Sequence, residues 1–426
     1  MKRLLLSIMY AMATFGIAAQ TLDELQEAAR ENYPVIKQYD LIRQTADASL
    51  SSIGKAWLPQ LQATAQGTMQ SDVAALPDML QDMMRQQGVG IKGLSKTQYR
   101  VGVDVSQLLY DGGTTRSQRS IARQQEAVST AQADVDLYTV RRRVNELYFS
   151  ILLVDERIGL NSDLQHVLQS NEEKLSAMFR GGTATASDVN AMKAERLAAE
   201  QQATELQSAR QSLTRMLSLL CGREIVKLVP VSPSPSMKPS VHDCQRPEMR
   251  LFDAQLRLAD AQEQQLKSAL MPRLSLFATG FYGYPGYDMF HDMLHRSATL
   301  NGMVGARLTW NIGQLYTHRA DKSRLDAQRS LVSVQREVFL FNNQLEQVQQ
   351  SEEVSRYEQL LAHDADIVQL RASVRQAAES KLNHGVISVN DLLQEINREN
   401  QAKTDRSMHE IEMMKHIYDL KYITNN

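Results

Sequence analysis

The sequence contains an internal repeat, which restricts the possible folds more than any other feature. Landmark residues of the first half recur in the same order in the second half: Pro34, Pro59, Gly102, Gly182 and Asp188 correspond to Pro247, Pro272, Gly305, Gly385 and Asp391. The prolines recur 213 positions on and the other three residues 203 positions on, so the first copy carries ten extra residues between Pro59 and Gly102. A repeat of this length indicates a duplicated structural unit. Each copy shows the pattern of helix, strand, loop, strand, long helix, turn and helix.

The first residues predict export. A charged start, Met1 to Arg3, precedes an apolar stretch from Leu4 to Ala19 that ends in small residues. This is the pattern of a signal peptide, and the stretch is slightly short for a spanning helix. We expect a signal peptide over residues 1–20; the alternative is an uncleaved membrane anchor.

A proline-rich stretch from Val229 to Ser240 separates the two copies. After the signal peptide we therefore expect a first repeat over residues 21–221, a linker over 222–243 and a second repeat over 244–426. Cys221 and Cys244 flank the linker. Export would permit a disulfide between them, and two unpaired thiols fit the sequence equally well.

Composition argues against several classes of function. The net charge is −2 and no basic face stands out, so nucleic acid is not an expected partner. No segment after the first 20 residues approaches the length of about 18 apolar residues that a spanning helix needs, so any membrane insertion must use strands. We find no phosphate-binding glycine loop and no nucleophile–base pair. The sequence therefore predicts neither an enzyme nor a bound cofactor or metal.

Two long stretches predict long helices. Residues 314–384 contain neither proline nor glycine, and residues 114–180 contain only Gly159. Both are rich in strong helix formers, and at 1.5 Å per residue each could form a helix roughly 100 Å long. Apolar residues recur at alternating spacings of three and four: Leu331, Val334, Val338, Phe341, Leu345 and Val348 in one series, and Leu206, Ala209, Leu213, Met216 and Leu220 in another. This heptad seam predicts helices packed side by side as in coiled coils.

Four other segments alternate between apolar and polar residues, which is typical of strands. Apolar Leu61, Ala63 and Ala65, for example, alternate with Gln62 and Thr64. Each segment has about ten residues, the length of a tilted strand that crosses a bilayer. The alternative is a sheet in a soluble protein.

Four strands cannot close a barrel, because the smallest membrane barrels have about eight and an open edge is not tolerated in lipid. If the strands span a membrane, several chains must share one barrel, and three chains would supply twelve strands. The polar face of the strands and the long helices then indicate a channel that continues outside the bilayer as a helical tube.

Specific strings resemble the TolC family of outer-membrane efflux channels over residues 21–422. The string from Gly102 to Gly113, GVDVSQLLYDGG, is similar to the family's strand-to-helix junction, and Leu308 to Gln314 is a less similar second copy. The strings that begin at Gly182 (GTATASDVNA) and at Gly385 (GVISVNDLL) resemble the family's turn between paired helices, in which a glycine precedes an aspartate by six positions.

The resemblance implies a mainly helical fold with membrane strands: coiled-coil helices that form an α-barrel and a twelve-stranded β-barrel shared by a homotrimer. The strands would be Leu58–Gln70, Gln98–Leu109, Pro272–Tyr284 and Gly302–Ile312, with external loops at Ser71–Thr97 and Pro285–Asn301. The helices would be Thr21–Trp57, Thr114–Arg180, Ser187–Leu220, Arg246–Leu270, Tyr316–Asn383 and Asn390–Tyr422.

The resemblance also implies a function and a location. The chain would be a passive channel of a tripartite efflux or secretion system in the outer membrane, in contact with outer-membrane lipid and extending into the periplasm. It would work with an inner-membrane transporter and a periplasmic adaptor, or membrane fusion protein. Gly182, Asp188, Gly385 and Asp391 would mark the periplasmic tip and contact the adaptor. Asp391, with Gln394 and Glu395 beside it, would line the narrowest point of the tunnel.

Two other functions remain open from the sequence alone. The chain could be a periplasmic coiled-coil adaptor, which would explain the helices and the export but not two pairs of amphipathic strands. It could also be an exported metalloenzyme, since His291 and His295 have metal-ligand spacing on a helix. Several methionines in the two loops (Met79, Met83, Met84, Met289 and Met293) could bind a soft metal, although packing within the loops explains them as well.

Overall fold

The computed structural model describes residues 20–91, 93–231 and 244–425. Most of the predicted signal peptide and residues 232–243 of the predicted linker lie outside these described residues. The chain divides into two compact units: one combines the described parts of Met1–Tyr39, Thr130–Phe252 and Val334–Asn426, and the other combines Asp40–Ser129 and Asp253–Ser333.

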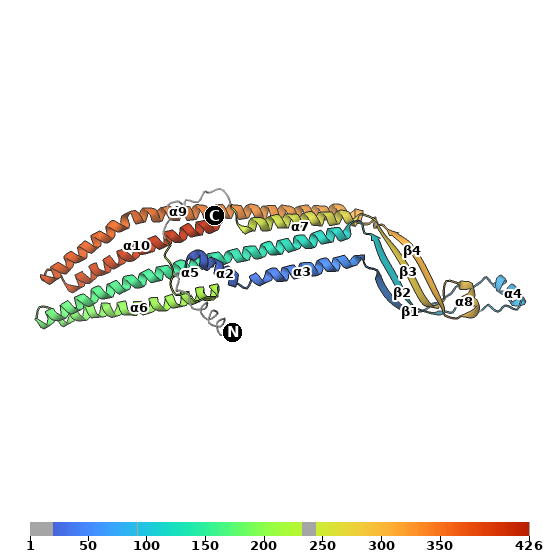
Figure 1. Cartoon of the computed structure of the whole chain (residues 1–426), viewed down its shortest axis with the longest axis horizontal. Coiled ribbons are helices and arrows are strands. Elements are labelled where there is room, and N and C mark those ends of the chain that lie inside the picture. Colours follow the sequence, from blue (N-terminus) through green and yellow to red (C-terminus); the bar gives the residue numbers. More distant parts are fainter. Residues whose placement is uncertain (1–19, 92, 232–243, 426) are drawn as a thin grey trace, which may run out of the picture. The chain divides into compact units, whose positions relative to one another are not determined.

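The order of elements repeats along the chain, as predicted (Figure 1). The first copy comprises α2 (Leu22–Asn32), α3 (Ile36–Gly54), the 3-10 turn η1 (Lys55–Trp57), β1 (Gln60–Met69), α4 (Asp78–Gln86), β2 (Thr97–Tyr110), α5 (Thr114–Arg180) and α6 (Ala186–Cys221). The second copy comprises α7 (Pro247–Ala269), β3 (Arg273–Tyr284), α8 (Met289–His295), β4 (Thr299–Thr309), α9 (Gln314–Asn383) and α10 (Val389–Thr424).

The long helices form two pairs, α5 with α6 and α9 with α10, each joined by a short turn (Figure 1). α5 has 67 residues and α9 has 70. Near the turns, one apolar core includes residues from both pairs, among them Leu168, Met192, Leu392 and Ile396. A second core lies in the same unit and centres on Tyr148 and Phe149, which are buried between α2, α6 and α10.

The prediction of one helix over Thr21–Trp57 is wrong. The helix ends at Asn32 and a new one begins at Ile36. Pro34 causes the break, since it lacks an amide hydrogen and forces the preceding residue out of the helical conformation. Tyr33 accordingly has an extended backbone, with φ −67° and ψ 132°.

Two further expectations need correction. The predicted external loops each contain a short helix, α4 and α8. Asp288 caps α8 by accepting a hydrogen bond from the His291 amide, whereas α4 begins after Pro77 without a side-chain cap. The seam predicted on α6 is shifted: Leu206 and Leu217 are buried, whereas Met216 is exposed. A period of 3.6 residues moves the buried stripe by one position over this distance.

Both cysteines are free thiols, Cys221 buried and Cys244 partly buried. Burial raises the pKa of Cys221 to about 11. Among the described helices, none contains an 18-residue stretch apolar enough to cross a bilayer.

Matching positions of the two helix pairs carry ion pairs of opposite polarity. Arg196 of α6 binds Glu172 of α5 at 2.6 Å and also pairs with Glu200. The equivalent residues of the second pair are reversed in charge: Glu399 of α10 binds Arg375 of α9 and Lys403. Burial acts to raise the pKa of Glu399, but hydrogen bonds from Lys403 and Arg375 outweigh it and leave the pKa below its ordinary value.

This reversal predicts a rescue. We expect Arg375→Glu to lower the free energy of unfolding by about 3–5 kcal/mol, because it places two carboxylates in a nearly buried contact. Arg375 also pairs with Glu379, where the first copy has Ser176. The quadruple variant Arg375→Glu/Glu379→Ser/Glu399→Arg/Lys403→Glu therefore reproduces the arrangement found in the first pair and should recover most of that loss. Denaturant titration in detergent measures both. A quadruple variant no more stable than Arg375→Glu would contradict this account.

Candidate functional site

The two inter-helix turns have the same backbone structure. Gly182 and Gly385 have positive φ angles of 76° and 69°. In the first turn the amide of Gly182 donates to the carbonyl of Phe179, and the amide of Thr183 donates to that of Met178. In the second turn the amide of Gly385 donates to the carbonyl of Leu382, and the amide of Val386 donates to that of Lys381. This pattern is the Schellman motif, which glycine favours because it has no Cβ.

A capping box starts the helix after each turn. Asp188 accepts hydrogen bonds from the Thr185 amide at 2.9 Å and the Thr185 hydroxyl at 2.7 Å. Asp391 accepts from the Ser388 amide at 3.0 Å and the Ser388 hydroxyl at 2.7 Å. Each cap hydroxyl accepts in return from the amide of its aspartate, so four polar groups are satisfied at each helix start.

These bonds favour the ionised form of both aspartates. The hydrogen bond from the Ser388 side chain, followed by that from its backbone, lowers the pKa of Asp391. Thr185 lowers the pKa of Asp188 in the same way. Asp391 is exposed and Asp188 is partly exposed, so each turn presents a negative charge at neutral pH.

The three residues predicted at the narrowest point lie on the first two turns of α10. Asp391 and Gln394 are exposed, while Glu395 is largely covered. Glu395 lies 3.8 Å from Arg371 of α9 and also pairs with Arg398. Arg371 was not among the residues expected at this site. The sequence spacing could have identified it. Arg371 precedes Glu395 by 24 residues, and Arg375, which binds Glu399 across the same helix pair, precedes its partner by the same number.

The four strands form one antiparallel sheet in the order β1-β2-β3-β4. The register aligns the apolar residues across all strands: Leu61 pairs with Val105, Val105 with Ala278, and Ala278 with Val304. These side chains therefore share one face, because neighbours directly across a sheet point to the same side.

The opposite face of the sheet is largely polar. Asp104 accepts a hydrogen bond from Thr279 at 2.7 Å, and Arg100 donates to Gln66 at 2.8 Å. In the single chain most residues of both faces remain accessible to solvent or partly so. The sheet is thus amphipathic, and among the described residues β1 and β4 each have one backbone edge without a partner strand.

A continuous apolar stripe on α9 is also uncovered. Its members are each more than half exposed: Leu331, Val334, Val338, Phe341, Leu345 and Val348. They are the six residues of the heptad seam that the sequence predicted on this helix. The predicted packing of that seam therefore does not occur within one chain.

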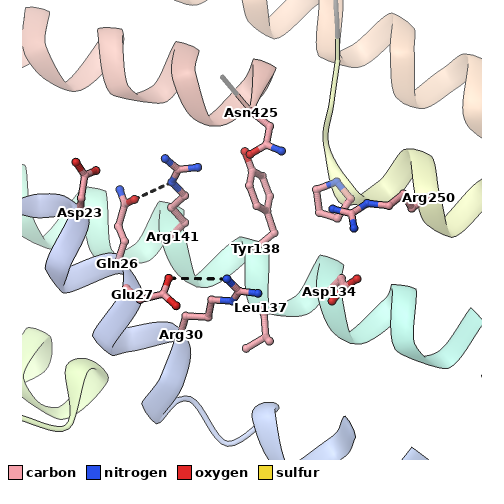
Figure 2. Close-up of a pocket in the computed structure, with 11 residues that line it drawn as sticks. Asp23, Gln26, Glu27, Arg30, Asp134, Leu137, Tyr138, Arg141, Arg250 and Asn425 are labelled. Atoms are coloured by element: carbon pink, nitrogen blue, oxygen red, sulfur yellow. Dashed lines mark hydrogen bonds and ion pairs between the residues drawn. The ribbon is translucent and has the colours of Figure 1, made fainter. Parts of the chain in front are cut away.

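A cavity of about 450 Å³ lies between α2, α5, the start of α7 and the end of α10 (Figure 2). Arg141 donates to Gln26 at 2.7 Å, and Arg30 lies 3.8 Å from Glu27. The lining contains three arginines and three acids, namely Arg30, Arg141, Arg250, Asp23, Glu27 and Asp134. Their charges balance, so the cavity favours neither anions nor cations.

His291 and His295 lie on α8 with stacked rings 4.5 Å apart. His295 Nδ1 lies 3.3 Å from the carbonyl of His291. The described residues contain no group of three or more His, Cys, Asp or Glu side chains placed to hold a metal ion. Met293 packs against Leu94 and Tyr284, as expected for a methionine that fills a loop core.

Comparisons agree with these features. A family model described as outer membrane efflux protein matches residues 25–223. No curated protein gives a significant match to the sequence. The family match confirms the resemblance over residues 25–223, and solved structures show the same fold over nearly the whole chain.

Several solved structures of channels have the same fold. CusC, described in connection with transmembrane channel formation, is 14% identical with a TM-score of 0.68, covering 96% of this chain and 92% of CusC. The outer membrane protein VceC from Vibrio cholerae is 16% identical with a TM-score of 0.64, covering 95% and 94%. The open state of the MtrE outer membrane channel from Neisseria gonorrhoeae is 17% identical with a TM-score of 0.65, covering 95% and 89%.

The turns give a prediction about glycine. Gly385→Ala should lower the free energy of unfolding by about 1–2 kcal/mol, because a Cβ is strained at positive φ. Gly159→Ala, in the middle of α5 with open space around it, should instead raise the free energy of unfolding by about 0.5–1 kcal/mol. Thermal unfolding of the two variants measures the contrast. If both variants changed the free energy of unfolding in the same direction, the result would be inconsistent with the positive φ angle of Gly385.

Proposed function

We propose that this chain, whose residues 25–223 match the outer membrane efflux protein family, is the passive outer-membrane channel of a tripartite efflux or secretion system. The family match and the shared fold support both the channel function and the location in the outer membrane. In this proposal the sheet crosses the bilayer and the helix pairs extend into the periplasm.

The sheet is the observation that carries the proposal. Its strands have 10 to 14 residues, enough for tilted strands to cross a bilayer. One face is apolar, as lipid requires, and the other carries Gln66, Arg100 and Asp104, as a water-filled lumen requires. A soluble protein would gain nothing by leaving Val101 and Val304 exposed on the same face.

The open edges of β1 and β4 support a homotrimer. Backbone groups without partners cost several kcal/mol each in lipid, so the edges must pair with other copies. Three chains would supply twelve strands and close the barrel. The uncovered stripe from Leu331 to Val348 supports the same assembly, since it would pack against a helix of the neighbouring chain.

We place the constriction at the turn end of α9 and α10. In a trimer, three copies of Asp391 would form an acidic ring, with Gln394 and Glu395 one turn further along the helix. A ring of carboxylates favours cations by its field. The hydrogen bonds from Ser388 keep Asp391 ionised and hold its side chain in place.

The turns would also contact a periplasmic adaptor, through which an inner-membrane transporter delivers the cargo. Gly182 and Asp188 in one turn, and Gly385 and Asp391 in the other, expose similar backbone shapes and charges. An adaptor could therefore bind both turns of each chain in equivalent ways. The alternative, that the chain is itself a coiled-coil adaptor, is not favoured, because it gives no role to the amphipathic sheet.

Substitutions on the two faces of the sheet test the membrane assignment. Val103→Arg places a charge on the apolar face and should destabilise the inserted protein by about 2–4 kcal/mol. Gln62→Arg places the same charge on the polar face, beside Asp104, and should be tolerated. The yield of folded trimer in the outer-membrane fraction measures both. Equal yields would show that neither face contacts lipid, and the channel proposal would fail.

A second experiment tests the constriction. Asp391→Asn should reduce the preference for cations and the block of single-channel current by divalent cations in planar bilayers. Asp188→Asn removes the equivalent carboxylate from the other turn and is expected to leave both properties unchanged. If divalent cations block the current through the Asp391→Asn channel as strongly as the current through the unmodified channel, Asp391 does not line the constriction.

A further inference from the structure

The two helix pairs differ in chemistry along the seam where their helices meet. In the pair α9–α10 this seam carries polar and ionisable side chains: Gln350, Tyr357, Asp364, His409 and His416. The equivalent positions of α5–α6, 203 residues earlier, are mostly apolar: Leu147, Val154, Asn161, Leu206 and Leu213. Duplication therefore produced one seam without ionisable groups at these positions and one seam with several.

The ionisable seam is a connected set of contacts between the two helices. His409 Nδ1 of α10 lies 2.8 Å from Asp364 Oδ2 of α9. About two helical turns closer to Gln350, the ring of Tyr357 stacks on His416 with 5.5 Å between centroids and also contacts His409. His416 Nδ1 in turn lies 2.5 Å from Gln350 Oε1. Tyr357 is only 9% exposed, so the contacts are largely shielded from water.

We propose that this seam is a proton-sensitive contact, in which protonation of His416 loosens α10 from α9 while the pair α5–α6 stays closed. The inference concerns the helix pair alone and does not rest on the proposed function.

The two histidines have different partners. His409 faces the carboxylate of Asp364, which can balance a positive charge on a ring. His416 faces the neutral amide oxygen of Gln350, which carries no such charge. Its other nitrogen, Nε2, lies 3.9 Å from Glu412, which is beyond hydrogen-bond distance.

The charged groups around His416 come from both helices. Lys415 and Glu412 lie on α10, and Arg356 and Glu353 lie on α9. Burial is the main cause that lowers the pKa of His416 below its ordinary value, and Lys415 lowers it further. A buried imidazolium ion without a hydrogen-bonded carboxylate is unfavourable, which explains the direction.

The direction of the pH effect follows from this shift. When the seam opens, His416 reaches water and regains an ordinary pKa near 6.5, so the open state binds a proton more readily than the closed state. The contribution of His416 to the stability of the closed seam is therefore fully present above pH 6.5. It is lost as the pH falls from 6.5 toward the pKa that His416 has in the closed state. At pH 5.5, one unit below 6.5, the population of the open state rises by up to about tenfold.

Another buried group on α10 would act in the opposite direction. Burial raises the pKa of Asp419, which lies near Arg142 and Glu146 of α5. A carboxyl with a raised pKa stabilises the folded state as the pH falls. Asp419 therefore cannot produce the loosening, and Asp419→Asn is a matched control on the same helix.

Hydrogen exchange of the full, assembled protein in detergent tests the proposal. Exchange is measured at pH 7.5, 6.5 and 5.5 and divided by the intrinsic rate at each pH. Protection of residues 409–420 in α10 should fall by up to about tenfold between pH 7.5 and 5.5. Protection of residues 206–217 in α6, measured in the same sample, should not change.

Three variants assign the effect. His416→Leu reproduces Leu213 of the other pair and should abolish the fall in protection; His416→Gln, uncharged at every pH, should do the same if the leucine variant does not assemble. Asp419→Asn should keep the fall. An equal fall in α6 and α10, persistence in both His416 variants, or disappearance in Asp419→Asn would each overturn the proposal.

Discussion

Backbone hydrogen bonding at the two edges of the sheet is the constraint on which the rest of the account depends. β1 and β4 each have one row of amide and carbonyl groups that no other strand in the described part of the chain reaches. Water could satisfy these groups, but lipid cannot. The apolar face of the sheet favours contact with lipid, but the unpaired backbone groups at its edges are unfavourable in lipid. An assembly of several chains resolves this conflict, because the edges then pair with one another.

The helical part of the chain shows the same incompleteness. The stripe on α9 that begins at Leu331 and ends at Val348 has the spacing of a packed seam, yet it is exposed in the single chain. A narrow apolar stripe along so long a helix is stable only when a neighbour covers it. The sheet and the helix therefore indicate independently that the functional unit contains more than one copy.

Duplication kept some features and reversed others. The two turns retain the same glycine geometry and the same capping box, because the backbone allows few other ways to reverse direction between long helices. The side chains between the helices were free to diverge. The ion pair of Glu172 with Arg196 has its charges reversed in the second copy, where Arg375 pairs with Glu399. His416 occupies the position of Leu213 in the first copy. The copies therefore share a shape and differ in how they respond to charge and pH.

Much of the fold could be predicted from the sequence because its signals are local. The absence of proline predicted α5 with the bounds that it has in the structure. Alternation predicted the four strands, and the bounds that the resemblance implied for them lie within three residues of their observed ends. The break at Pro34 could have been predicted, because the residues beside it, Tyr33 and Val35, are weak helix formers as well. Arg371 was missed because its contact with Glu395 depends on the register between two helices, which the pattern of one helix does not contain.

The roles proposed for Asp391, Gln394 and Glu395 cannot be derived from one chain, since a constriction exists only where copies meet. The most direct test of the central claim is therefore the mass and shape of the protein extracted in detergent, by light scattering combined with electron imaging. The account predicts three chains in one particle, with a tube on the order of 100 Å long or more, as the rise of the helices requires. A single chain that remains in solution without detergent would contradict it.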